Sequence, residues 1–167
     1  MEKREETHRN VLLEARPIYT SVTLEDFAKI AARAGCHATV RNSGDMPHLA
    51  LTQGRRAFQA CMDAPALDPN LYSVIDLQAE LTLPQTVSDA AIARVNSTMR
   101  FVQVGRTGRR TVRIHMALVL DGGVTAAWLE QSLQHWMLNW RACERQLQDA
   151  VAPTRPQQTW LGAELVH

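Results

Sequence analysis

The most regular pattern in this chain runs from Thr111 to Leu147, where an apolar alternation of period two changes to one of period three to four. Alternation of period two is typical of a β-strand with one face against a core, and the longer period is typical of an amphipathic helix. Gly122 and Gly123 permit a sharp turn between the two, and Thr125 is placed to cap the helix. The alternating residues are Val112, Ile114, Met116, Leu118 and Leu120, and the helical stripe is Leu129, Leu133, Trp136, Trp140, Cys143 and Leu147.

The N-terminal half predicts one helix followed by several strands. Thr23 with Asp26 has the spacing of a capping box, so we expect a helix from about Leu24 to Ala34, ended by Gly35. Short alternating segments separated by turn residues predict strands after this helix, and two prolines predict a surface loop over 64–70. The predicted strands are 37–41, 48–52, 56–62 and 75–83.

The C-terminal half begins with a second helix. Thr86 to Asp89 is a helix start, and Ile92, Val95 and Met99 then share one face. Phe101 to Val104 predicts a strand, and the segment from Arg106 to Arg109 predicts a hairpin turn into the long strand. The element order α-β-β-β-β-α-β-β-α predicts an α+β fold, an antiparallel sheet with its helices on one face. We expect an N-terminal extension over 1–19, a domain over 20–150, and a C-terminal linker and tail over 151–167.

Composition changes this picture little. The chain has 167 residues, 46% of them hydrophobic, with 18 basic and 17 acidic residues. A net charge of +1 argues against a protein that coats nucleic acid, and no apolar run approaches the length of a membrane span. The three cysteines cannot all pair within the chain, and no signal peptide is visible, so we expect free thiols and a cytoplasmic protein.

Catalytic and metal-binding patterns are not found. The histidines lack the close spacing of a compact metal motif, and there is no H-E-x-x-H or G-x-S-x-G segment. We therefore expect no enzyme, no metal and no cofactor. An enzyme would require His, Cys or carboxylate groups that converge in a pocket, and His115 with His135 is the simplest such pair.

Arginines gather at two predicted turns. One turn carries Arg55 and Arg56, and the other carries Arg106, Arg109 and Arg110. If both turns open at the same end of the sheet, their guanidinium groups form an anion-binding patch. Solvated arginines at turns are the alternative.

The long predicted helix is apolar on more than one face. Trp136 and Trp140 belong to the core stripe, whereas Trp128, Met137 and Leu138 lie off it. A second apolar face indicates a second contact, with another subunit or with the C-terminal tail, which carries Trp160. We predict that Trp128, Met137 and Leu138 on the helix and Trp160 in the tail form an interface.

Several local signatures resemble the YbjN family of bacterial sensory transduction regulators. They are the segments 22–26, 94–96 and 99–101, Gly35, and above all Leu120-Asp121-Gly122-Gly123-Val124-Thr125 with Leu129 and Trp136. The resemblance covers about 20–147 and implies a fold like that of type III secretion chaperones, small proteins that dimerise and hold segments of other proteins. The segment 64–70 and the tail beyond Asp149 depart from the family, and no catalytic residue is implied.

Two functions follow as hypotheses. The first is a non-catalytic regulatory or chaperone-like module, homodimeric, that binds a protein or peptide through exposed apolar surface. The alternative is a sensor that binds a small ligand or anion at the arginine-bearing turns.

Overall fold

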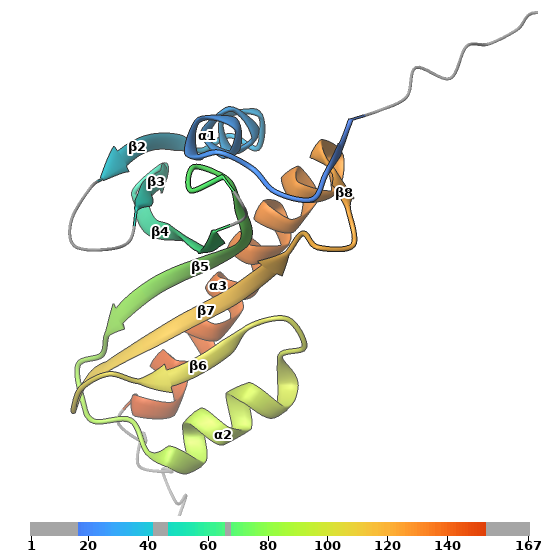
Figure 1. Ribbon diagram of the computed structural model, residues 1–167. Helices are drawn as coiled ribbons and strands as arrows, with labels where there is room; N and C mark the ends of the chain where they lie inside the picture. The colour runs from blue at the N-terminus through green and yellow to red at the C-terminus, as the bar shows by residue number, and fades with distance from the viewer. Residues whose placement is uncertain (1–16, 42–46, 66–67, 153–167) are drawn as a thin grey trace, which may run out of the picture.

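The computed structural model describes residues 17–41, 47–65 and 68–152, and these form an α+β fold (Figure 1). The predicted class and element order are confirmed, with two short strands added. The strands are β1 (Ile18–Tyr19), β2 (His37–Arg41), β3 (His48–Gln53), β4 (Arg56–Pro65), β5 (Tyr72–Thr82), β6 (Gln103–Arg106), β7 (Thr111–Val119) and β8 (Val124–Thr125). The helices are α1 (Leu24–Arg33), α2 (Asp89–Thr98) and α3 (Ala126–Val151).

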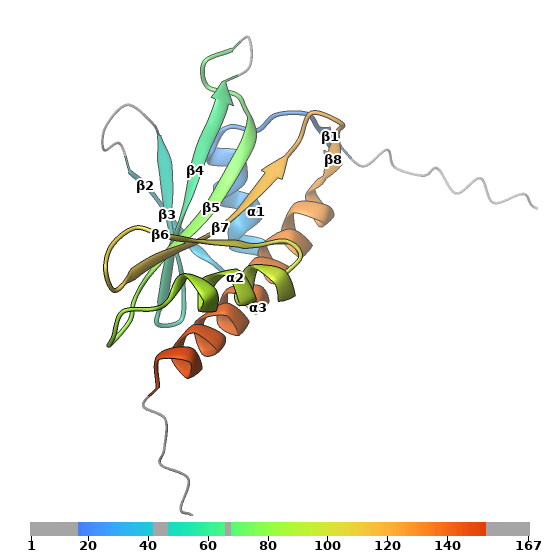
Figure 2. The same ribbon diagram turned by 90° about the horizontal axis from the view of Figure 1, so that it is seen from below.

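Six strands form one antiparallel sheet in the order β2-β3-β4-β5-β7-β6. The central pair is β5 with β7, which stay in register from Val74 opposite Val119 to Thr82 opposite Thr111. The remaining two strands, β1 and β8, pair with each other just before α3 begins. The sheet twists strongly, so β2–β4 and β5–β7 fan apart in Figure 2.

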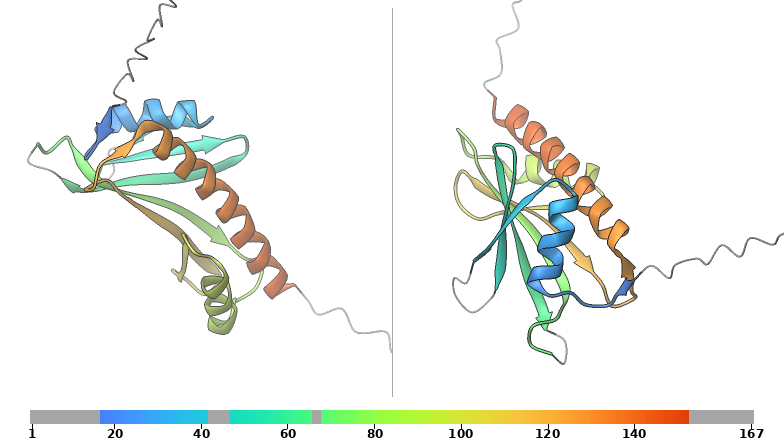
Figure 3. Two further views of the ribbon diagram at one scale, coloured as in Figure 1. Left: turned by 90° about the vertical axis from the view of Figure 1, so that its right-hand side faces the viewer. Right: turned by 90° about the horizontal axis from the view of Figure 1, so that it is seen from above.

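One face of the sheet holds the core. Successive strand residues alternate between the two faces, and the buried residues of each inner strand fall on the same face. Helices α1 and α3 cover this face, and α2 packs against β6 and α3 (Figure 3). Trp136 and Trp140 stack at its centre and Phe58 packs against both at steeper angles, with ring centroids 5.9–6.1 Å apart.

Side-chain caps fix where each helix begins. The hydroxyls of Thr23, Ser88 and Thr125 accept hydrogen bonds from the N–H groups of Asp26, Ala91 and Trp128. Each cap satisfies one of the free N–H groups at a helix start, which stabilises the helix by about 1 kcal/mol. The sequence predicted all three starts within a residue or two.

Three predicted boundaries in the sheet are wrong. Strand β4 continues to Pro65, where it pairs with Tyr72, so the predicted loop 64–70 is shorter than expected. Strand β5 accordingly begins at Tyr72 rather than Ile75. Strand β6 begins at Gln103, which leaves Phe101 outside the sheet and 67% exposed. This last difference shapes the candidate site.

Candidate functional site: an open sheet edge beside an apolar groove

The two last strands of the sheet differ in length. Strand β7 has nine residues, and its neighbour β6 has four. The pairing of β6 covers β7 only from Val112 to His115. On the side of β7 away from β5, the segment Met116–Val119 therefore has no strand beside it within the described ranges, and we call this segment the open edge.

The hydrogen bonds around β7 show which backbone groups point toward the β6 side. In an antiparallel strand successive residues alternate in direction. Leu120 donates its N–H to Ser73 and Arg110 accepts from Leu83, both on the β5 side, whereas Thr111 accepts from Thr107 in the β6–β7 turn. Even-numbered residues of β7 thus bond to β5, and odd-numbered residues point toward β6.

Ala117 and Val119 are the odd-numbered residues of the open edge. Their backbone N–H and C=O groups point away from β5, and no hydrogen bond to them is found among the residues that the structure describes. Together they present two donors and two acceptors in the geometry of a β-ladder. Such a row is a template for pairing with another extended segment.

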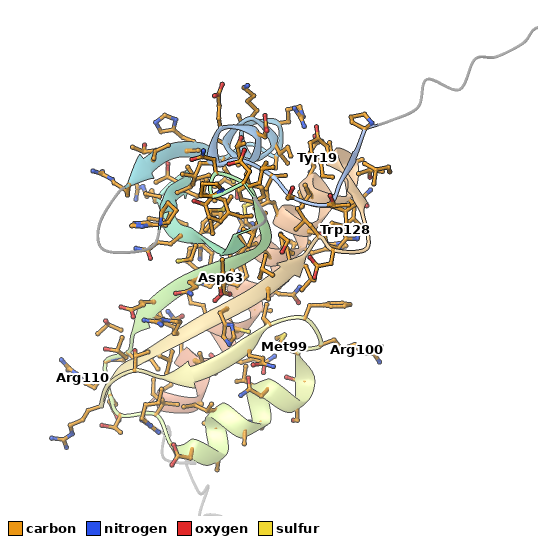
Figure 4. All side chains as sticks on the ribbon, in the orientation of Figure 1. Tyr19, Asp63, Met99, Arg100, Arg110 and Trp128 are labelled. Carbon is orange, nitrogen blue, oxygen red and sulfur yellow. The ribbon has the colours of Figure 1, made fainter. Side chains whose placement is uncertain are left out.

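An apolar groove of about 270 Å³ runs along the open edge. Its floor is β7 from Met116 to Leu118, and its walls come from α3 and from the chain before β6. Trp128 and Phe101 stand at its rim, 41% and 67% exposed. Figure 4 shows Trp128 near the end of β7, and Met99 and Arg100, which precede Phe101 in the sequence, on the chain between α2 and β6. The groove residues are Phe101, Met116, Ala117, Leu118, Trp128, Ser132 and His135.

The local backbone structure fixes the position of Trp128 at the side of the groove formed by α3. Gly123 has a φ of +81°, which turns the chain from β7 into β8, and Thr125 then caps the N–H of Trp128 at 3.1 Å. A Cβ at Gly123 would lie 2.7 Å from Cγ2 of Ile18, so only glycine fits between the turn and β1. The predicted glycine turn therefore positions the first turn of α3 beside the open edge.

Two polar side chains line the groove. Ser132 is only 9% exposed, and its hydroxyl has no hydrogen-bond partner among the described residues. His135 lies one turn further along the same face of α3 and is exposed. An apolar groove with a few polar groups is typical of a site that binds a ligand or a segment of chain.

The predicted interface residues separate in the structure. Trp128 lies at the groove, and Leu138 is 61% exposed on α3. Met137 is buried, because the second apolar face of α3 packs on the chain after α1, where Cys36 lies 4.0 Å from its sulfur. Met137 is therefore a core residue and the prediction that it joins an interface is wrong. Trp160 lies outside the described residues.

The arginines of the two turns are largely occupied by neighbouring groups. Arg56 pairs with Glu144 at 2.8 Å and lies over the ring of Trp140, and Arg106 pairs with Asp89 at 2.6 Å. The register places both turns at the end of the sheet where β7 begins, and Figure 4 shows Arg110 there. Arg110 donates to the carbonyl of Pro84. Arg55 and Arg109 form no ion pair with another residue in the described part of the chain.

The histidines do not converge. His115 projects to the uncovered face of the sheet, 3.5 Å from Asp76, whereas His135 lies on α3 across the sheet. No group of three metal-ligating side chains is found among the described residues. On this face Gln78 donates to Oδ2 of Asp76 at 2.7 Å, whereas the buried Oδ1 of Asp76 has no hydrogen-bond partner among the described residues. Arg113 pairs with Glu80 at 3.0 Å, and both line a hollow of about 440 Å³.

The three cysteines are free thiols, as predicted. Burial raises the pKa of each thiol, that of Cys143 to about 11, and Asp76 adds to the raised pKa of Cys61. A thiol with a raised pKa is mostly protonated at neutral pH and is a poor nucleophile. At Cys61 the pKa-lowering effect of Arg113 is outweighed by burial and Asp76, so none of the described thiols has the lowered pKa of a reactive thiolate.

No family model matches this chain, and no similar protein is found among the curated ones. The resemblance to the YbjN family accordingly stays a prediction from the residues. No described helix has both the length and the apolar character needed to cross a membrane.

The sequence reasoning missed the open edge, Phe101 and Ser132. The available signal was the unequal length of two neighbouring alternations. The pattern from Val112 to Leu120 is about twice as long as the one from Phe101 to Val104, and a hairpin of such strands leaves part of the longer one uncovered.

Proposed function

We propose that this protein is a non-catalytic binding module that holds an extended segment of another protein by adding it as a strand to the open edge. The segment pairs its backbone with Ala117 and Val119 and places alternate apolar side chains in the groove between Phe101 and Trp128. Strand addition of this kind combines affinity from backbone bonds with specificity from side-chain pockets. The chaperone-like role suggested by the family resemblance belongs to the same class.

The observation that carries the proposal is the coincidence of two features in one place. Unpaired ladder groups lie directly beside a groove with exposed apolar side chains, 41% at Trp128 and 67% at Phe101. Folded proteins usually blunt an exposed strand edge with charge, proline or a covering segment. The open edge has none of these in the described residues, so a segment that covers it fits the chemistry of both features.

The expected affinity is moderate. Four backbone hydrogen bonds contribute about 0.5–1.5 kcal/mol each, and two buried apolar side chains about 1.5–3 kcal/mol each. Association costs at least about 4 kcal/mol in lost freedom. The balance of about 1–8 kcal/mol corresponds to micromolar binding at the strongest, as suits reversible capture.

Formation of a homodimer would compete with peptide binding for the backbone groups of Ala117 and Val119. If two copies pair antiparallel about Leu118, Ala117 of one copy faces Val119 of the other, so the open edge is self-complementary. Sedimentation at increasing concentration separates this arrangement from capture by a monomer.

The test is titration of the protein with synthetic peptides in which valine or leucine alternates with threonine. Val119→Pro removes the outward N–H and should weaken binding at least about tenfold, since about 1.4 kcal/mol is lost. Val119→Thr is the matched control, because it keeps the N–H and the branched shape, and should stay within about threefold of the parent. Equal affinities for the two variants, or no binding by any peptide, would overturn the proposal.

A further inference from the structure

We propose that residues 11–15 of this same chain, Val11-Leu12-Leu13-Glu14-Ala15, occupy the groove and pair with the open edge when no other protein is bound. This inference rests on the proposed function and adds its regulation. The chain thereby protects its own open edge, and a binding partner must displace the segment to reach Ala117 and Val119.

The first argument is the place where the N-terminal segment leaves the fold. Strand β1 pairs antiparallel with β8, with Ile18 opposite Thr125 and Tyr19 opposite Val124. The residue before Ile18 therefore lies toward the start of α3, whose first turn carries Trp128. The segment begins beside one wall of the groove.

The position of β1 is fixed by its neighbours. Ile18 lies against the Gly123 turn, Tyr19 packs on the core, and Val22 exchanges two backbone hydrogen bonds with Tyr72, each of 3.0 Å. The Gly123 contact holds β1 beside the turn that joins β7 to β8, four residues after Val119, the last residue of β7. The segment before Ile18 consequently starts beside the turn that follows the open edge.

Chain length suits this placement. Val11 is seven residues before Ile18, and an extended chain advances about 3.3 Å per residue, so Val11 can lie up to about 23 Å from it. The open edge, four residues of β7, spans only about 13 Å. The C-terminal tail starts further away, because about 19 residues of α3, or about 28 Å, separate Val151 from Ser132.

The composition of the segment matches the groove. Among residues 1–16, Val11-Leu12-Leu13 is the one apolar run, and polar or charged residues flank it on both sides. In an extended strand Val11, Leu13 and Ala15 share one face, which suits the groove. Leu12 and Glu14 then lie beside Ala117 and Val119 on the uncovered face, where water reaches the carboxylate of Glu14.

The physical consequence is competition within one molecule. A segment tethered by a few residues reaches an effective concentration of about millimolar, so even weak pairing keeps the groove occupied. The apparent affinity for an added peptide then equals its affinity for an empty groove multiplied by the fraction of molecules whose groove is empty. We expect a reduction of at least about fivefold relative to a chain whose segment cannot dock.

The experiment compares the full chain with its Val11→Asp/Leu13→Asp variant by NMR-detected hydrogen exchange of the Ala117 and Val119 amides. The matched control, Thr7→Asp/Asn10→Asp, adds the same two charges and leaves the apolar run intact. We expect both amides to exchange at least about tenfold more slowly in the parent and the control than in the variant. All four substituted positions lie before Pro17, outside the described residues.

Four results would overturn the inference. They are fast exchange of both amides in every chain, equal protection in the variant and the parent, protection that rises with protein concentration, and protection lost only on Trp160→Asp. The third result identifies a second copy as the occupant, and the fourth identifies the C-terminal tail. Peptide titration of the Val11→Asp/Leu13→Asp variant tests the proposed function separately. If this variant binds peptide while the Ala117 and Val119 amides of the parent chain are unprotected, the proposed function stands and only its regulation by residues 11–15 is removed.

Discussion

The side of β7 that faces away from β5 has two halves that the fold treats in opposite ways. From Val112 to His115 it is covered by β6, and the outer side of β6 is itself closed by a side chain. The amide of Asn96 donates to the carbonyl of Val104 at 2.9 Å and accepts from its N–H at 2.8 Å, as a neighbouring strand would. From Met116 to Val119 neither a strand nor an amide covers the backbone within the described residues.

The comparison shows that the other described edge of the sheet differs in character from the open edge of β7. At the opposite edge β2 exposes three polar or charged residues, His37, Thr39 and Arg41, together with the single apolar residue Val40. Charged and polar side chains discourage pairing with another strand. Only the open edge of β7 combines free ladder groups with an apolar groove among the described residues, and this difference motivates the proposed function.

The largest expected effect comes from placing proline at one or the other of two neighbouring residues of β7. Leu118→Pro removes a buried side chain and an N–H that bonds to β5, so it should lower the free energy of unfolding by about 3 kcal/mol or more. Val119→Pro removes only an outward N–H and should cost about 1 kcal/mol. Chemical denaturation measures both. Similar losses for the two variants would contradict the assigned directions of the backbone groups.

The closed half is tested at Asn96. Asn96→Ala leaves the N–H and C=O of Val104 to solvent and should lower the free energy of unfolding by about 1–2 kcal/mol. Asn96→Asp keeps an acceptor for the N–H and should lose less. Thermal unfolding followed by circular dichroism measures this difference. A neutral Asn96→Ala change would mean that the edge of β6 does not need its cap.

The groove walls provide the next comparison. Trp128→Ala should weaken peptide binding about tenfold and change the free energy of unfolding by less than about 1 kcal/mol, because the ring is 41% exposed. Leu138→Ala is the matched control on the same helix, since Leu138 is 61% exposed and lies outside the groove. Calorimetric titration with the alternating peptides distinguishes them. Equal weakening would place the binding surface along the outside of α3 instead.

The smallest expected effect concerns self-association. A lysine at an exposed strand edge disfavours pairing with a second copy. Val119→Lys should therefore reduce any association of the Val11→Asp/Leu13→Asp variant, in which the open edge is bare. Val40→Lys is matched in exposure, 51% against 54%, and lies on β2. Light scattering at increasing concentration should respond to the first substitution and not to the second.

Periodicity predicted the fold because its signals are local. The alternation from Val112 to Leu120 reports which face is buried, and the caps at Thr23 and Thr125 report where helices begin. Each signal depends on neighbours within a few residues, so it survives without tertiary information. The class, the element order and most core residues follow from it.

The site was harder to predict because it depends on contacts between distant segments. Phe101 and Val102 are both apolar, and only tertiary packing buries the second and exposes the first. Met137 looked like an interface residue because no sequence pattern shows that Cys36 packs on it. The arginines at the turns likewise looked free, and the carboxylates that pair with Arg56 and Arg106 lie 88 and 17 residues away.

The most direct test of the central claim is hydrogen exchange at the open edge with a bound peptide. The Val11→Asp/Leu13→Asp variant would be saturated with an alternating peptide, and exchange of the Ala117 and Val119 amides followed by NMR. Strand addition predicts that both amides slow by at least about tenfold, while the already paired amides of Arg113 and His115 change little. Bound peptide with unchanged exchange at Ala117 and Val119 would contradict it.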